Sequence, residues 1–301
     1  MTLVWIASLV LSVHAEDPTP TATLEQQRAQ CEEAEDSSAC IDVGRRYLDG
    51  QPNDAGLILA NAYFQIACDR DDAVGCSLLA TNLYFGNGIE KDVVAAAKYY
   101  RNACYGEIPH YPACFDLSGI IQRGEVRATA SLNRTALLKR ACDGGVADGC
   151  TYLGRSYLDG DARTLERAAA LLERACDGGS IEGCATLGAE HLPGGAFSTD
   201  ADRAIPLLRK TCAQGNVRGC SNLATAYTNG FGVERDFDES RRLYALSCKQ
   251  NDPTACRGLG ILYAEGFGVD VDQERARTLF EHACRSGDPV SCDILRQAIR
   301  Q

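Results

Sequence analysis

Residues 248–284 read CKQNDPTACRGLGILYAEGFGVDVDQERARTLFEHAC and hold one full unit of the pattern that decides the fold. Cysteines stand at both ends of the unit, and Cys256 follows the first of them by eight residues. Gly260 and Tyr263, four and seven residues after Cys256, fall on one face of a helix. Gly266 predicts the end of this first helix, helix A, because glycine adopts a left-handed backbone without strain.

A second helix, helix B, is predicted between that glycine and the next cysteine. Its large pair, Leu279 and Phe280, precedes Cys284 by five and four residues. An aspartate stands where an N-cap accepts the first free amides of helix B, and Thr164 is expected to do so in its own unit. The aspartates at this place are Asp92, Asp200, Asp236 and Asp272.

The unit recurs along the chain, with the first cysteines of successive pairs 34 to 38 residues apart. A period near 36 is typical of a solenoid of helical hairpins, and no segment alternates at period two as a strand would. The prediction is therefore an all-α fold, an α/α solenoid over residues 24–301, with about seven hairpins between a half-repeat at each end.

The periodicity also predicts how the 16 cysteines pair. Each pair flanks a short connector between helix B and the next helix A, where two turns of an antiparallel hairpin face each other. Each local bridge would contribute at most ~2.5 kcal/mol in the chain-entropy model. The expected disulfides are Cys31–Cys40, Cys68–Cys76, Cys104–Cys114, Cys142–Cys150, Cys176–Cys184, Cys212–Cys220, Cys248–Cys256 and Cys284–Cys292.

The N-terminus predicts export to an oxidising compartment, periplasmic or secreted, where such bridges persist. Residues 1–15 resemble a signal peptide: Leu3–Val13 is an almost unbroken apolar run, and cleavage is expected between Ala15 and Glu16. A short buried helix is the alternative, since no Lys or Arg precedes the run. Residues 16–23 are expected to be a linker, and nothing later is apolar enough to span a membrane.

Composition and spacing argue against several kinds of ligand. The formal net charge of −11 disfavours a nucleic-acid partner, because acidic surfaces repel phosphate. A structural zinc site typically has two ligands two to four residues apart, and no cysteine pair meets that spacing. There is no Cys-x-x-Cys redox motif and no Cys-x-x-Cys-His haem motif. We therefore expect no metal and no cofactor.

The phrase Gly-x-Gly-Val-x-x-Asp follows helix A at residues 230–236 and 266–272, and at 86–92 with Ile for Val. With the small-residue and tyrosine positions, it resembles the Sel1-like repeat, and the cysteine pairs resemble the Helicobacter cysteine-rich protein family, over residues 31–292. The resemblance implies a right-handed, tetratricopeptide-like superhelix with helix A lining the concave side. It also implies an adaptor or scaffold, or, as some cysteine-rich members are described, a penicillin-binding protein with slow β-lactamase activity.

The residues favour the scaffold and predict no catalytic residue. There is no Ser-x-x-Lys tetrad, and the nearest match to Lys-Thr-Gly is Lys210-Thr211-Cys212, which the repeat explains. The histidines of the mature chain, His110, His191 and His282, stand in different repeats, and His191 fills the slot of a core tyrosine.

We expect a monomer that binds a protein or peptide, such as a cell-envelope component, through solvent-facing residues of helix A; plain solvated charge is the alternative for each. The candidates are Arg45, Arg46, Asn82, Arg155, Asn222 and Arg257. The third connector, residues 105–113, is irregular, and Arg134 takes a small-residue position after it; this repeat hosts a partner, bends the superhelix or reflects drift. Asn133, in an Asn-Arg-Thr sequon, is expected within a helix.

Overall fold

The computed structural model describes residues 22–50, 54–129 and 132–298, and the predicted cleavage site Ala15–Glu16 lies outside them. The described residues form 16 helices and no strand, which confirms the all-α fold class. Helix A of successive repeats is α3 (Ser37–Gly50), α5 (Ala73–Phe85), α7 (Tyr111–Gln122), α9 (Ala147–Arg155), α11 (Ile181–Glu190), α13 (Val217–Asn229), α15 (Pro253–Glu265) and α17 (Pro289–Ala298).

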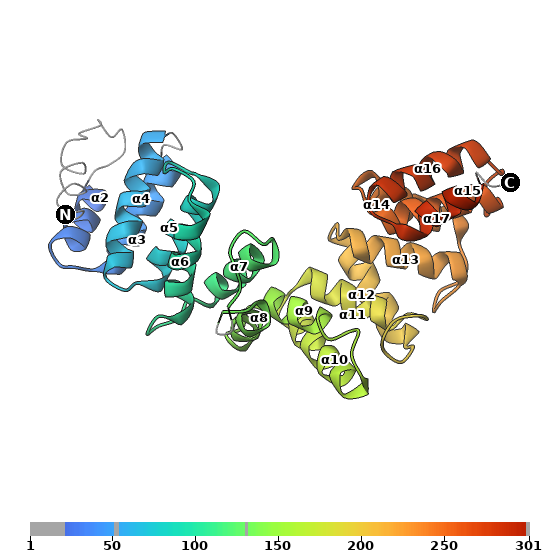
Figure 1. Cartoon of the computed structure of the whole chain (residues 1–301), viewed down its shortest axis with the longest axis horizontal. Coiled ribbons are helices and arrows are strands. Elements are labelled where there is room, and N and C mark those ends of the chain that lie inside the picture. The colour runs from blue at the N-terminus through green and yellow to red at the C-terminus, as the bar shows by residue number, and fades with distance from the viewer. Residues whose placement is uncertain (1–21, 51–53, 130–131, 299–301) are drawn as a thin grey trace. The chain divides into compact units, whose positions relative to one another are not determined.

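Helix B takes the intervening places. These helices are α2 (Ala22–Glu32), α4 (Asp54–Asp69), α6 (Val93–Tyr105), α8 (Arg134–Asp143), α10 (Ala162–Asp177), α12 (Ala201–Ala213), α14 (Phe237–Lys249) and α16 (Gln273–Arg285). The chain forms two compact units, the first ending at Val146 and the second beginning at Ala147. Within each unit, Figure 1 shows helices A and B alternating as packed hairpins.

Small residues let the two helices of a hairpin approach. In the last complete hairpin a methyl group at Gly260 would lie 2.8 Å from the ring of Phe280, so the glycine gives that ring its space. Phe280 is buried, and so are Ala276 and Leu262 beside it in the core of the second unit. The predicted roles of the small residue and of the large pair are therefore core packing.

Capping residues define where the helices begin and end. Gly266 ends α15 with φ 72°, in the left-handed region that glycine favours. Asp92, Asp200, Asp236 and Asp272 each accept a backbone amide at the start of a helix B, as predicted.

Two predictions of where a residue lies relative to the start of a helix B are wrong. Asp161 caps α10, and Thr164 lies inside the helix with its amide donating to that carboxylate over 2.9 Å. Asn133 is the N-cap of α8 and not a residue within a helix: its side chain accepts from the amide of Ala136. In each place the short polar side chain at the N-cap, Asp161 or Asn133, accepts a free amide of the first turn.

Candidate functional site

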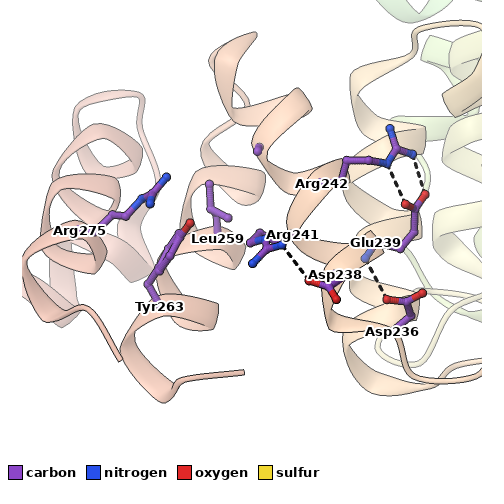
Figure 2. Close-up of a pocket in the computed structure, with 9 residues that line it drawn as sticks. Asp236, Asp238, Glu239, Arg241, Arg242, Leu259, Tyr263 and Arg275 are labelled. Carbon is purple, nitrogen blue, oxygen red and sulfur yellow. Dashed lines mark hydrogen bonds and ion pairs between the residues drawn. The ribbon is translucent and has the colours of Figure 1, made fainter. Parts of the chain in front are cut away.

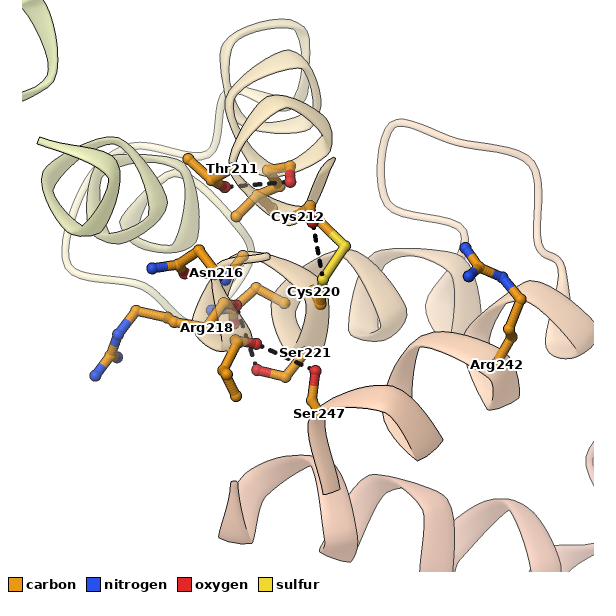
Figure 3. Close-up of a disulfide and its surroundings, with 12 residues drawn as sticks. Thr211, Cys212, Asn216, Arg218, Cys220, Ser221, Arg242 and Ser247 are labelled. Carbon is orange, nitrogen blue, oxygen red and sulfur yellow. Dashed lines mark hydrogen bonds between the residues drawn. A yellow bond between two sulfur atoms is a disulfide. The ribbon is translucent and has the colours of Figure 1, made fainter. Parts of the chain in front are cut away.

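Within the two units, seven of the predicted disulfides are described, and each closes a connector between helix B and the next helix A. At the one drawn in Figure 3, Cys212 ends α12, Cys220 lies in the first turn of α13, and their Cα atoms are 4.5 Å apart. Asn216 between them caps α13 by accepting from the amide of Gly219. The bridges are Cys31–Cys40, Cys68–Cys76, Cys104–Cys114, Cys176–Cys184, Cys212–Cys220, Cys248–Cys256 and Cys284–Cys292. The pairing Cys142–Cys150 stays a prediction.

The polar residues expected to face solvent on helix A divide into three kinds. Arg45 and Arg46 are exposed. Asn82 is buried, and the prediction for it is wrong: its side-chain amide donates to Asn61 Oδ1 over 2.6 Å, between α5 and α4. Arg155, Asn222 and Arg257 are half-buried, and all three use their side chains within the fold.

A carboxylate joins three helices A of the second unit. Glu182, in the first turn of α11, accepts from Arg155 Nη1 of α9 over 3.3 Å. It also accepts from Arg218 Nε and Asn216 Nδ2 at α13, over 2.9 and 3.1 Å. The side chain of Arg155 is thereby engaged within the array, so this residue is better explained as a link between repeats than as a contact for a partner.

An open depression in the second unit gathers charged and aromatic side chains from three helices (Figure 2). Two of its three arginines are paired on α14: Arg241 with Asp238 over 2.8 Å, and Arg242 with Glu239 over two hydrogen bonds of 2.6 and 2.7 Å. Hydrogen bonding from Arg242 holds the pKa of Glu239 below its usual range. The lining residues are Asp236, Asp238, Glu239, Arg241, Arg242, Ala245, Leu259, Tyr263 and Arg275.

The third arginine of the depression differs from the other two. Arg275, in the first turn of α16, sets its guanidinium over the Tyr263 ring, 4.2 Å from the ring centre. It makes no ion pair with any residue that the structure describes. An arginine stacked on an aromatic ring still has its N–H groups free at the edge of the guanidinium. Arg275 and Tyr263 therefore form a platform, a flat surface that can bind a hydrogen-bond acceptor. No local spacing in the sequence signalled this platform.

The three histidines among the described residues lie in separate surroundings. His110 stands before α7 at the N-cap position, where it makes no capping hydrogen bond. His191 is buried and packs against Phe197, with Nδ1 3.0 Å from the carbonyl oxygen of Ser198, which suits a residue that replaces a core tyrosine. His282 lies against the Cys248–Cys256 bridge. Thr211, of the Lys-Thr-Cys stretch, is buried in α12 with its hydroxyl donating to Leu207.

Among the described residues, no helix is both long and apolar enough to cross a bilayer.

The chain matches the model of the Sel1 repeat in six stretches: residues 37–72, 73–106, 147–180, 181–216, 217–252 and 253–288. Each stretch begins at the first residue of a helix A and runs through the following connector. The irregular third repeat, residues 107–146, falls between the matched stretches.

Three known proteins are similar to the chain. Cytochrome c oxidase assembly factor 7A of Xenopus laevis is 32% identical over 108 residues, which are 35% of this chain and 46% of that protein. A protective antigen of uropathogenic Escherichia coli with an SLR fold has a TM-score of 0.77 at 23% identity, over 91% of this chain and 59% of the antigen. Helicobacter pylori cysteine rich protein B is 28% identical, covers 45% of this chain and 98% of its own length, and has a TM-score of 0.35. The chain thus spans less than two thirds of the first two relatives.

Proposed function

The chain belongs to the Sel1 repeat family, and we propose that it is an extracytoplasmic scaffold that binds a protein partner and catalyses no reaction of its own. Sel1 repeat proteins generally mediate protein–protein interactions. The assembly-factor name of the Xenopus laevis relative accords with such a role.

One observation carries the proposal: the platform that Arg275 and Tyr263 form in the depression beside α14. Arginine and tyrosine are over-represented among residues that dominate binding at protein interfaces. The charges of Arg241 and Arg242 are balanced by their own carboxylates, whereas Arg275 keeps a positive charge for a partner. We infer that the partner sets an acidic side chain against Arg275, with its neighbouring apolar atoms on Tyr263.

A matched pair of variants tests this site. Arg275→Gln removes the charge of the platform, and Arg277→Gln removes a charge two residues away that pairs with Glu281 on the exposed side of α16. Wild type and both variants serve as baits for the native envelope fraction, and each captured protein is purified and its affinity measured. We expect Arg275→Gln to weaken binding tenfold or more and Arg277→Gln to change it less than twofold. Equal binding by both variants would reject the site.

A photo-crosslinking amino acid locates the contact directly. Placed at Ala245, in the depression, it should form a covalent adduct with the purified partner. Placed at Val94, which is exposed on α6 of the first unit, it should form none. Adducts at Val94 alone would show that the partner binds elsewhere.

The location outside the cytoplasm is part of the proposal. The disulfides of the array suit a non-cytoplasmic environment, since cytosolic thiols are kept reduced. The chain expressed in a Gram-negative host should appear in the periplasmic fraction, and N-terminal sequencing should begin at Glu16. A product that retains Met1 and stays in the cytoplasm would contradict export but would leave the proposed binding site unaffected.

A further inference from the structure

One histidine of the array lies directly against a disulfide of the preceding repeat. His282 Nδ1, on α16, is 3.2 Å from Cys256 Sγ and 3.8 Å from Cys248 Sγ. Its other ring nitrogen, Nε2, lies 3.2 Å from Asn251 Oδ1 in the connector that the bridge closes. Both cysteines are buried and His282 is half-buried, so the three side chains meet beneath the surface of the second unit.

We propose that Cys248, Cys256 and His282 form a zinc site that the disulfide masks and reduction opens. A dithiol reductant supplies two electrons and two protons: the Cys248–Cys256 bond breaks, two thiols form, and the reductant leaves as its own disulfide. Zn²⁺ then displaces the two thiol protons and binds both thiolates and the imidazole Nδ1. The oxidised protein lacks the thiolates and does not bind the ion here.

The geometry suits a tetrahedral ion. Zinc bonds of about 2.3 Å to sulfur and about 2.0 Å to nitrogen place a tetrahedral N,S pair ~3.5 Å apart and an S,S pair ~3.8 Å apart. The two observed distances from His282 Nδ1 to sulfur, 3.2 and 3.8 Å, bracket the first of these values. Reduction breaks the S–S bond, so the two sulfurs can then move apart to the S,S separation of ~3.8 Å. Asn251 Oδ1 lies 3.2 Å from Nε2 and so orients the ring, as residues that hydrogen-bond the free nitrogen of a metal-binding histidine do.

The site exists at one repeat because of a single side chain. His282 stands two residues before a first cysteine, and this register faces the preceding connector elsewhere too, as where Arg140 Nε donates to the carbonyl of Cys104 over 2.9 Å. None of the other residues in this register has an imidazole. They are Ala29, Ile66, Asn102, Arg140, Arg174, Lys210 and Leu246. The spacing of two to four residues that is typical of zinc ligands was applied to each cysteine pair alone. It takes no account of a ligand from the next repeat, such as His282.

The experiment uses the full chain, reduced under metal-free conditions, with Co²⁺ as the spectroscopic probe and Zn²⁺ measured by competition with a chelator. Circular dichroism first confirms that the reduced chain is helical. We expect one tight site with thiolate-to-cobalt absorption, and a loss of affinity of tenfold or more in His282→Leu. Lys210→Leu, in the same register, should bind as wild type does. Leu246→His should add a second tight site at Cys212–Cys220. Equal affinities for wild type and His282→Leu would overturn the proposal.

A second measurement keeps the other bridges oxidised. Cys256→Ala leaves the Cys248 thiol beside His282, and should bind Co²⁺ more weakly, with thiolate-to-cobalt absorption that the double variant Cys256→Ala/His282→Leu loses. Absorption that is missing from Cys256→Ala, or that survives in the double variant, would also reject the site. Neither measurement involves the platform of Arg275, so failure here leaves the proposed function standing.

Discussion

Arg257 Nη1 donates to Asp288 Oδ1 over 2.6 Å, and this pair ties α15 to the residue that immediately precedes the last helix, α17. The second carboxylate oxygen of Asp288 accepts the amide of Ser291 over 2.7 Å. Asp288 is 6% exposed, which makes its carboxylate one of the few buried charges in the second unit. The charge pair and the helix cap are therefore one interaction with two partners.

Asp288→Ala should destabilise α17 by about 2 kcal/mol, because it removes the cap and leaves the Arg257 charge half-buried without its carboxylate. Hydrogen exchange of peptides from residues 289–298 measures the local change. Asp293→Ala is the control: Asp293 pairs with Arg296 on the exposed side of the same helix and should change exchange little. Similar exchange in both variants would contradict the role of Asp288.

His110→Asn should stabilise the first unit by about 1 kcal/mol near neutral pH, because asparagine caps helices and His110 makes no capping hydrogen bond. Asn216 already shows this cap at the equivalent place before α13. Thermal unfolding of His110→Asn and of Glu107→Gln, an exposed change in the same connector, measures the gain. A melting temperature that rises equally in both variants would exclude the cap as its cause.

The advantage of His110→Asn should grow as the pH falls. Burial lowers the pKa of His110, with the Arg45 charge acting in the same direction and Asp72 opposing them. The folded state therefore favours the neutral ring, so its contribution to stability is present above the unfolded pKa of about 6.5 and is lost as the pH falls through the lower folded pKa. Melting temperatures at pH 7.5 and 5.5 should diverge between wild type and variant. A constant difference would contradict the lowered pKa.

Peptide mapping of the non-reduced protein should find eight local disulfides, including Cys142–Cys150. Removing one bridge, as in Cys176→Ala/Cys184→Ala, should lower the free energy of unfolding by at most ~2.5 kcal/mol, since the closed loop is short. Peptides that link cysteines of different connectors would refute the pairing scheme.

Purified oxidised protein should not turn over nitrocefin faster than buffer, because no Ser-x-x-Lys tetrad supplies a nucleophile with a neighbouring amine. Turnover that one point substitution abolishes would establish the β-lactamase alternative instead.

The fold could be predicted because the same core, cap and cysteine positions recur in successive repeats. The helix B caps at Asp92 and Asp236, for example, follow from their constant distance to cysteines. The sequence was less informative where two polar residues compete for one role, as Asp161 and Thr164 do before α10. The inward turn of Asn82 depends on its partner Asn61 in a different helix.

The candidate site could not be read from local spacing. Tyr263 and Arg275 lie on two helices with a loop between them, and their contact depends on how those helices pack. The same holds for His282, whose partners are 26 and 34 residues away. Such contacts join side chains of different helices, whereas the periodic sequence pattern indicates only which positions of each helix are buried or capping.

The shortness of the bridges bears on how the chain is made. Each of these seven disulfides joins cysteines 8 to 10 residues apart, so under the proposed export both partners would leave a translocation channel almost together. Loop closure over so few residues is fast, whereas cysteines of different connectors must wait for more chain to emerge. On that route, oxidation would proceed from the N-terminus while the chain emerges, and local pairing would be kinetically favoured over pairing between connectors.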